Sequence, residues 1–346
     1  MAPGNSQPGT GFIMVDNPAS AATGLDRIGA VPRRVRASDP RSRRRAKTYR
    51  KYSHLWFVLP GLIFFAGFMI YPAISGFAIS LTAWSGVGND FHFIGFDNFI
   101  AALTSWSLYR AAYHNLIMFV VILIFQHTVG LFIAVQLNAR PRFMEVYRTI
   151  LFLPVIISLI STGFIWTLML SPNIGVINPV LHAVGLGFLA HSWLSDPHLA
   201  LGTVIAVQCW NVLGWAVIIY LAGLQSIPEE LMQAAEIDGA TAWQRFWRVA
   251  FPLLSPSFTS LTVLTFIGQF RVFDIVYVLT GPIGSPNFET DVLGTLIYRS
   301  AFGGSAVASN DVRMSYALAL ALIVFIAMAV ISTVLIRVLR RREIEV

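Results

Sequence analysis

The sequence has few of the residues that soluble enzymes use for chemistry. Charged residues make up 12% of its 346 positions, it has one cysteine, Cys209, and its only lysines are Lys47 and Lys51. A single cysteine cannot form an internal disulfide. A phosphate-binding loop requires the pattern Gly-x-x-x-x-Gly-Lys-Ser/Thr, and neither lysine follows a glycine. We therefore do not expect this chain to bind or hydrolyse ATP by itself.

Patterns typical of metal sites and catalytic sites are missing as well. The seven histidines show no His-Glu-x-x-His spacing. One segment between apolar runs contains three histidines, His182, His191 and His198. Loop histidines are mostly solvated, so this grouping does not indicate a metal site. There is no Gly-x-Ser-x-Gly elbow and no paired-carboxylate pattern. We expect a non-catalytic chain with no metal site and no cofactor of its own.

Apolar runs dominate the rest of the sequence. Hydrophobic residues make up 56% of the chain, and the mean hydropathy is +0.68. An apolar run of about 20 residues is long enough to cross a bilayer as a helix. We predict an all-α polytopic membrane protein with six transmembrane helices, at about residues 55–83, 115–137, 149–170, 199–225, 257–280 and 313–336.

The basic residues indicate which side of the membrane each segment faces. Of the 24 Lys and Arg, all but four lie in residues 1–51, 138–148, 226–256 and 337–342; those four are Arg110, Arg271, Arg299 and Arg313. Basic residues gather on the cytoplasmic side of membrane proteins. We predict that both termini and residues 226–256 are cytoplasmic, and that the basic tails contact membrane lipid rather than nucleic acid.

Composition also divides the chain into parts. We predict a disordered basic cytoplasmic tail over residues 1–52, a six-helix transmembrane domain over 53–342 and a C-terminal tail over 343–346. The segments expected to be outer loops are 84–114, 171–198 and 281–312. Residues 175–189, within the second of these, are apolar enough to lie along the membrane surface.

Residues 226–256 form the longest mixed polar segment between the apolar runs, and they predict two short helices joined by a glycine turn. Ser226 followed by Glu229 has the spacing of a capping box at a helix start. Gly239 is typical of a helix end. A second capping box is expected to begin at Thr241. This order favours a docking element over a flexible tether.

Polar residues in the fourth predicted span share one helical stripe. Gln208, Asn211 and Trp215 follow the spacing i, i+3 and i+7. Two amide groups and an aromatic face suit an uncharged solute rich in hydroxyl groups. Hydrogen bonding between helices is the alternative interpretation.

The fifth predicted span carries polar and aromatic residues close together. They are Gln269, Phe270, Arg271, Phe273, Asp274 and Tyr277. Arg271 and Asp274 are three residues apart and can pair on one helical face. One interpretation is a buried structural ion pair. The other is a polar pathway in which the aromatic rings stack on sugar rings.

The 226–256 segment resembles the cytoplasmic EAA loop of permease subunits in bacterial ABC importers, whose pattern is Glu-Ala-Ala, three residues, Gly, nine residues, Ile-x-Leu-Pro. The residues at these positions are Gln233, Ala234, Ala235, Gly239, Val249, Phe251 and Pro252. The fuller pattern is similar to that of the carbohydrate branch, through Asp238, Ala240 and Phe246. Two departures are Gln233 in place of glutamate, which removes a charge, and Ile283 after Gly281-Pro282, where the family has Gly-Gly-Pro. The resemblance covers about residues 55–340.

The resemblance implies a multi-subunit importer in the bacterial cytoplasmic membrane. A second, homologous permease subunit would complete the pathway, and two cytoplasmic ABC ATPases would hold ATP and Mg²⁺. A periplasmic or lipid-anchored binding protein would deliver a sugar or oligosaccharide. The residues expected to couple to the ATPases are Glu229, Glu230, Gln233, Ala234, Ala235, Asp238, Gly239, Ala240, Phe246 and Pro252. Those expected along the substrate pathway are Gln208, Asn211, Trp215, Gln269, Arg271, Phe273, Asp274 and Tyr277.

Two alternatives belong to other classes. An ion-gradient-driven secondary transporter is suggested by the Arg271–Asp274 spacing, although inverted repeats are not detectable in the sequence. A membrane enzyme has no supporting residues. The sequence does not identify the transported solute, and relatives of this family also carry glycerol phosphates.

Overall fold

The computed structural model describes residues 58–139, 141–303 and 313–341, without the side chains of 141–144. The tails predicted over residues 1–52 and 343–346 lie outside the described residues. The chain divides into two compact units, Met1–Ile63 and Phe64–Val346. Of the first unit, residues 58–63 are described, and they are helical and exposed. Everything below concerns the second unit unless the first is named.

Within the described residues the fold is helical, with one isolated antiparallel bridge between Thr82 and Phe93. Four helices are long and apolar enough to cross a membrane: Val58–Ser80, Trp106–Asn138, Ala200–Gln225 and Met314–Arg340. Two bent helix pairs, Glu145–Ile156 with Leu159–Leu170 and Ala242–Leu253 with Ser255–Phe270, are each either a broken span or a re-entrant loop. The all-α membrane class is confirmed, with four to six spans.

The first predicted span is a helix from residue 58 to residue 80, with a π-helical turn, η1 (Ala66–Ile70), before α2 (Tyr71–Ser80). Pro72 lies in the first turn of α2, where a missing N–H is tolerated. No residue is buried in the most apolar 18-residue segment of this helix. In the second unit, α2 packs on α16 (Met314–Arg340).

The second span begins earlier than predicted. After the short helix α3 (Asp97–Thr104), one helix runs through α4 (Trp106–Phe125), the π-helical turn η2 (Gln126–Gly130) and α5 (Leu131–Asn138). The expected loop at 84–114 is therefore wrong from residue 97 onward, where α3 and the start of α4 are helical. Its polar residue His114 and the adjacent Asn115 are buried between helices, so their polarity did not indicate a loop.

The third span was predicted as one helix but is sharply broken. The helices α6 (Pro141–Ile156) and α7 (Leu159–Leu170) meet at 93°. Pro154 removes a hydrogen bond from the last turn of α6, and Ser158 has an extended conformation. Residues 171–198, expected as a loop, contain the short helices α8 (Ile177–Ala183) and η3 (Gly187–Leu189).

The helix α9 (Ala200–Gln225) lies at the centre of the fold and confirms the fourth predicted span. In its most apolar 18-residue segment, 61% of the residues are buried. The helix contributes to two of the three apolar core clusters. Neighbours approach it closely through glycines. A Cβ added at Gly130 would lie 2.6 Å from the Ala216 Cβ, and one added at Gly214 would lie 2.4 Å from the Leu151 carbonyl oxygen. Small residues at helix contacts are typical of membrane proteins.

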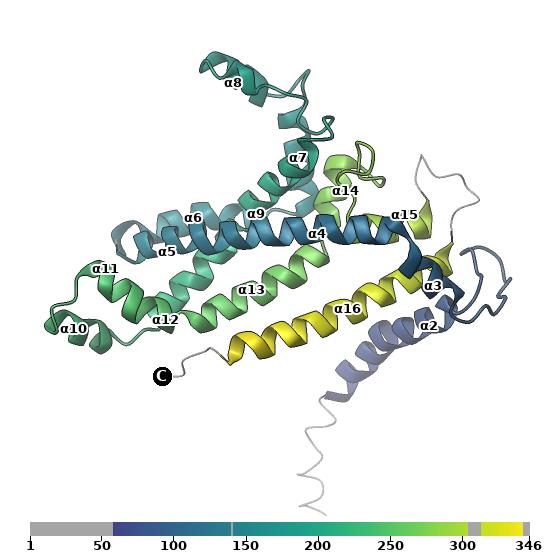
Figure 1. Cartoon of the computed structure of the whole chain (residues 1–346), viewed down its shortest axis with the longest axis horizontal. Helices are drawn as coiled ribbons and strands as arrows, with labels where there is room; N and C mark the ends of the chain where they lie inside the picture. The colour runs from purple at the N-terminus through teal and green to yellow at the C-terminus, as the bar shows by residue number, and fades with distance from the viewer. Residues whose placement is uncertain (1–57, 140, 304–312, 342–346) are drawn as a thin grey trace, which may run out of the picture. The chain divides into compact units, whose positions relative to one another are not determined.

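The segment between α9 and the next long helix consists of α10 (Glu229–Ile237), α11 (Ala242–Arg245), the π-helical turn η4 (Phe246–Ala250) and α12 (Phe251–Leu253). The chain returns along α9 through α13 (Ser255–Phe270). Figure 1 shows α10–α12 at one end of α13 and α14 (Asp274–Thr280) at the other.

The prediction of a single helix over residues 257–280 is wrong. The helix α13 ends at Phe270, and α14 begins at Asp274 after a break. The predicted outer loop 281–312 is also wrong in part, because residues Leu293–Phe302 form α15, which packs on α4 and α16. Residues 304–312 of that predicted loop lie outside the described residues.

Candidate functional site

A cavity of about 460 Å³ lies between α9, α13 and the break that follows α13. Seven of the eight residues predicted along a substrate pathway line it: Gln208, Asn211, Trp215, Gln269, Arg271, Phe273 and Asp274. The eighth, Tyr277, lies one turn further along α14 and contacts the Phe273 ring, with 5.2 Å between ring centroids. The two stripes predicted separately thus meet in one place.

The α9 stripe combines a structural residue with a free acceptor. Asn211 is buried and donates from Nδ2 to the Pro154 carbonyl at 2.9 Å, which connects α9 to the last turn of α6. Carbonyls in a last turn have no partner further along their own helix. The interhelical alternative therefore holds for Asn211. Gln208 is different, because its buried Oε1 has no partner in the structure.

The α13 side of the cavity presents a second free acceptor. Gln269 is buried, and its side-chain Oε1 has no partner. One turn earlier, Thr265 donates to Gln126 Oε1 at 2.5 Å, and Gln126 Nε2 donates to the Val212 carbonyl at 3.3 Å. Two residues that line the cavity, Gln208 and Gln269, therefore each have a buried amide oxygen with no partner among the described residues, beside a satisfied polar pair. Unpaired buried acceptors are costly unless a ligand or water satisfies them.

The break after α13 separates Arg271 from Asp274, which were expected to pair on one helical face. Arg271 caps the end of α13, and Asp274 is the first residue of α14. Both side chains are exposed, and the ion pairs found among the described residues do not include them. The buried structural ion pair is therefore wrong, because the helix that would align the two residues ends between them.

The aromatic residues of this region have different surroundings. Phe273 lines the cavity, whereas Phe270 packs in the core against Phe266 and Phe119. Trp215 lines the cavity from α9 and meets Phe152 edge-on. The expectation that Phe270 offers a stacking face is wrong.

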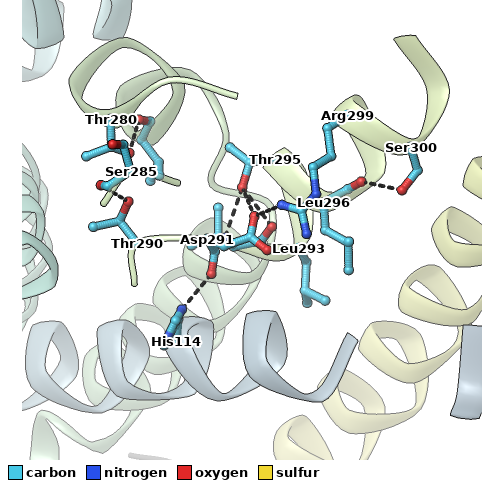
Figure 2. Close-up of polar contacts among 12 residues, drawn as sticks. His114, Thr280, Ser285, Thr290, Asp291, Leu293, Thr295, Leu296, Arg299 and Ser300 are labelled. Carbon is cyan, nitrogen blue, oxygen red and sulfur yellow. Dashed lines mark hydrogen bonds and ion pairs between the residues drawn. The ribbon is translucent and has the colours of Figure 1, made fainter. Parts of the chain in front are cut away.

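A buried polar cluster that the sequence did not reveal holds the segment beyond the break (Figure 2). The Asp291 carboxylate is fully buried, pairs with Arg299 and accepts from Thr295 Oγ1 at 2.8 Å. His114 Nδ1 donates to the Asp291 backbone carbonyl at 2.7 Å, so the cluster joins α15 to α4. Only the eight-residue spacing of Asp291 and Arg299 could have indicated it.

The predicted ATPase-coupling residues lie along α10–α12 as a largely exposed segment. Gly239 ends α10 with a positive φ of 80°, as predicted, and Thr241 and Gln244 form the expected capping box. The capping box at Ser226 is wrong. Pro228 is the residue before α10, and Ser226 Oγ instead donates to the Gly223 carbonyl at 2.8 Å, at the end of α9.

The remaining predicted coupling residues lie on the same segment. Glu229 and Glu230 occupy the first turn of α10, and Gln233 Nε2 donates to Glu229 Oε1 at 3.1 Å. Ala234 is exposed and Ala235 half-buried. The other members are Asp238, Ala240, Phe246 and Pro252. Phe246 begins the π-helical turn η4, and Pro252 is the second residue of α12.

An apolar patch on this segment was missed by the sequence reasoning. Trp243 and Trp247 contact each other with ring centroids 5.5 Å apart, and Trp247 contacts Phe251 at 4.9 Å. Ile237, at the end of α10, is 87% exposed. The i, i+4, i+8 spacing of the three aromatic residues was the available signal. Exposed apolar patches commonly mark protein contacts.

Among the described residues, no group of three His, Cys, Asp or Glu could hold a metal ion. The ionisable clusters are the pairs Asp90–His92, Glu236–Arg245 and Asp291–Arg299. The site therefore combines amide, hydroxyl and aromatic groups with the charged side chains of Arg271 and Asp274.

Comparison with known proteins gives consistent matches. A family model described as "Binding-protein-dependent transport system inner membrane component" matches residues 99–344. The chain is 31% identical to the multiple sugar-binding transport system permease MsmF of Streptococcus mutans over 86% of this chain and 99% of MsmF. It is 32% identical to the lactose transport system permease LacF of Rhizobium radiobacter over 81% of this chain and 93% of LacF.

A solved structure is also similar. It is a chain of a bacterial ABC transporter involved in the import of the acidic polysaccharide alginate, with a TM-score of 0.72 and 27% sequence identity. The match covers 86% of this chain and 99% of that chain. The similarity therefore extends over nearly the whole of the compared proteins.

Proposed function

Because this chain belongs to the family of binding-protein-dependent transport inner membrane components, we propose that its α9–α13 cavity binds a saccharide during ATP-driven import. The resemblance drawn from residues 226–256 is confirmed by the family match and by the named relatives. The chain is a multi-pass permease subunit of the cytoplasmic membrane, not an enzyme.

The observation that carries the saccharide proposal is that two residues lining one cavity, Gln208 and Gln269, each have a buried amide Oε1 with no partner among the described residues. Saccharide hydroxyls are donors that can satisfy both acceptors, and the Phe273 and Trp215 rings offer faces to the C–H side of a sugar ring. The names of MsmF and LacF point to sugars as well. The Arg271 and Asp274 side chains, both exposed, give the site cationic and anionic hydrogen-bonding groups.

The proposed topology has six spans and cytoplasmic termini. Each bent helix pair then counts as one span, which gives the even number that places both termini on one side. The distribution of Lys and Arg supports the cytoplasmic side for the termini and for α10–α12.

The proposed partners follow from the α10–α12 segment and the family. The exposed patch of Trp243, Trp247 and Phe251 suits burial in a cleft of a cytoplasmic ATPase, which would hold ATP and Mg²⁺. Ala234 lets the α10 backbone approach such a partner closely, and Gly239 makes the turn that presents α10. A second permease subunit would complete the pathway, and a binding protein would deliver the saccharide.

The ion-gradient alternative is not supported. The Arg271–Asp274 pair that suggested it does not form, and both residues are exposed at a helix break. Uptake by this chain alone, driven by a proton or sodium gradient without ATP, would overturn the proposal.

The test uses the complete complex in proteoliposomes, with the saccharide that its binding protein retains as substrate. We expect Gln208→Leu and Gln269→Leu each to raise the KM for uptake about five- to tenfold, since each removes one hydrogen bond. Gln136→Leu is the matched control, because Gln136 is exposed on α5 and does not line the cavity. An unchanged KM in both cavity variants would contradict the proposed site.

A further inference from the structure

A row of four aromatic rings begins at the cavity and continues beyond it along α14 and α15. Phe273 lines the cavity, and its ring centroid is 5.2 Å from that of Tyr277 and 5.2 Å from that of Tyr298. Tyr277 and Tyr298 are 5.1 Å apart, and Tyr298 is 5.2 Å from Phe302. We call these four residues the aromatic row.

The aromatic row is a surface feature rather than part of the core. None of its members belongs to the three apolar core clusters. Phe302 is 65% exposed, and the other three are half-buried. Tyr277 and Tyr298 each carry a hydroxyl group, so the middle of the row has hydroxyls beside its ring faces. Rings with polar tips suit a ligand that is both apolar and hydroxylated.

The surrounding structure fixes the row in place. At Gly294, α15 meets the helix break so closely that an added Cβ would lie 2.6 Å from the Val272 carbonyl oxygen and 2.9 Å from the Phe273 Cβ. Arg299, the residue after Tyr298, is held by its buried ion pair with Asp291 (Figure 2). A rigid support lowers the ordering cost when a ligand binds.

We propose that the aromatic row is a second saccharide subsite, which stacks successive sugar rings of an oligosaccharide as the chain passes to or from the cavity. This inference rests on the proposed function. The occupant is a saccharide because the row is continuous with the saccharide cavity through Phe273 and because its central rings carry hydroxyls. Phe302 is two ring-to-ring steps of 5.2 Å from Phe273, so a saccharide bound in the cavity needs further sugar units to contact it.

The row therefore makes a prediction about chain length that the cavity alone does not make. Loss of the ring at Tyr298 or Phe302 weakens the binding of longer oligosaccharides. It leaves the binding of shorter ones unchanged. Tyr298→Leu and Phe302→Leu keep an apolar side chain but remove the ring, and Tyr298→Phe keeps the ring. The matched control is Tyr113→Leu, since Tyr113 is exposed on α4 and lies outside the row.

The experiment measures uptake by the reconstituted complex of a disaccharide, a tetrasaccharide and a hexasaccharide from the oligosaccharide series that the native complex transports. Panels of neutral glucans, xylans and uronate oligosaccharides identify that series. We expect Tyr298→Leu and Phe302→Leu to raise the KM for the hexasaccharide about fivefold and that for the disaccharide less than about twofold. Tyr113→Leu retains the native values, and Tyr298→Phe, which keeps the ring but loses a hydroxyl, raises the KM for the hexasaccharide less than Tyr298→Leu does.

The other outcomes overturn the inference. Equal losses at every chain length, or loss of the partner permease on size-exclusion chromatography, would show that the row is structural or a subunit contact. Native KM values in the variants at every length would show that it does not bind substrate. Failure of the native complex to transport any saccharide would instead overturn the proposed function, so the two failures are distinguishable.

Discussion

The Asn115 side chain donates from Nδ2 to the backbone carbonyl of Gln269 at 2.6 Å. Its Oδ1 accepts from the Leu293 backbone N–H at 2.8 Å, so one fully buried amide on α4 joins the end of α13 to the start of α15. Gln269 lines the cavity and α15 carries Tyr298, which means that both proposed subsites are held by the same residue.

We predict that Asn115→Leu destabilises the permease by about 2–4 kcal/mol, because it leaves a buried carbonyl and a buried N–H without partners. Asn115→Asp keeps the acceptor for Leu293 but loses the donor, so its loss should be smaller. Thermal unfolding in detergent, followed by tryptophan fluorescence, ranks the stabilities of the native chain and the two variants. Equal stability of Asn115→Leu and the native chain would show that water replaces both bonds.

The buried Asp291–Arg299 pair leads to a second prediction. Asp291→Asn leaves the Arg299 charge buried without its counter-ion, and we expect a loss of about 3–5 kcal/mol. Combining it with Arg299→Met removes both charges and should recover part of that loss. The same unfolding assay measures the stabilities of the single and double variants. A double variant less stable than either single variant would contradict the assigned pairing.

Gly294 gives a third prediction, about the contact between α15 and the helix break. An added methyl group meets backbone atoms of Val272 and Phe273 that cannot rotate away. We expect Gly294→Ala to destabilise the permease by about 1–3 kcal/mol and to raise the KM for long oligosaccharides. Gly202→Ala is the control, since nothing lies within 4 Å of its added Cβ and alanine favours a helix. Similar thermal unfolding midpoints for Gly294→Ala and Gly202→Ala would argue against a tight contact between α15 and the helix break.

Local chemistry and periodicity predicted much of this molecule. The Gln208–Asn211–Trp215 stripe and the polar run from Gln269 to Asp274 were identified separately, and the structure places both around one cavity. The Gly239 turn and the capping box at Thr241 were also predicted, because both depend on a few neighbouring residues.

The remaining features depend on contacts between residues far apart in the sequence. Hydropathy predicts an apolar run but not a bend inside it, so the breaks near Ser158 and Arg271 were missed. The partner of Asp291 at His114 is 177 residues away, and no local pattern indicates it. The same applies to Asn115, the first residue of the second predicted span, whose bonds to Gln269 and Leu293 no local pattern indicates.

We propose that α10 transmits ATP-driven motion from the ATPase to the saccharide pathway of this chain. Ala234 is exposed on α10, so Ala234→Trp adds bulk at the proposed ATPase contact without filling the core. Ala139→Trp is the matched control, at an exposed alanine that follows α5. The decisive measurement is ATP-dependent saccharide uptake by the reconstituted complex. We expect uptake to be lost with Ala234→Trp and retained with Ala139→Trp. Native uptake by Ala234→Trp would show that α10 does not couple the chain to the ATPase.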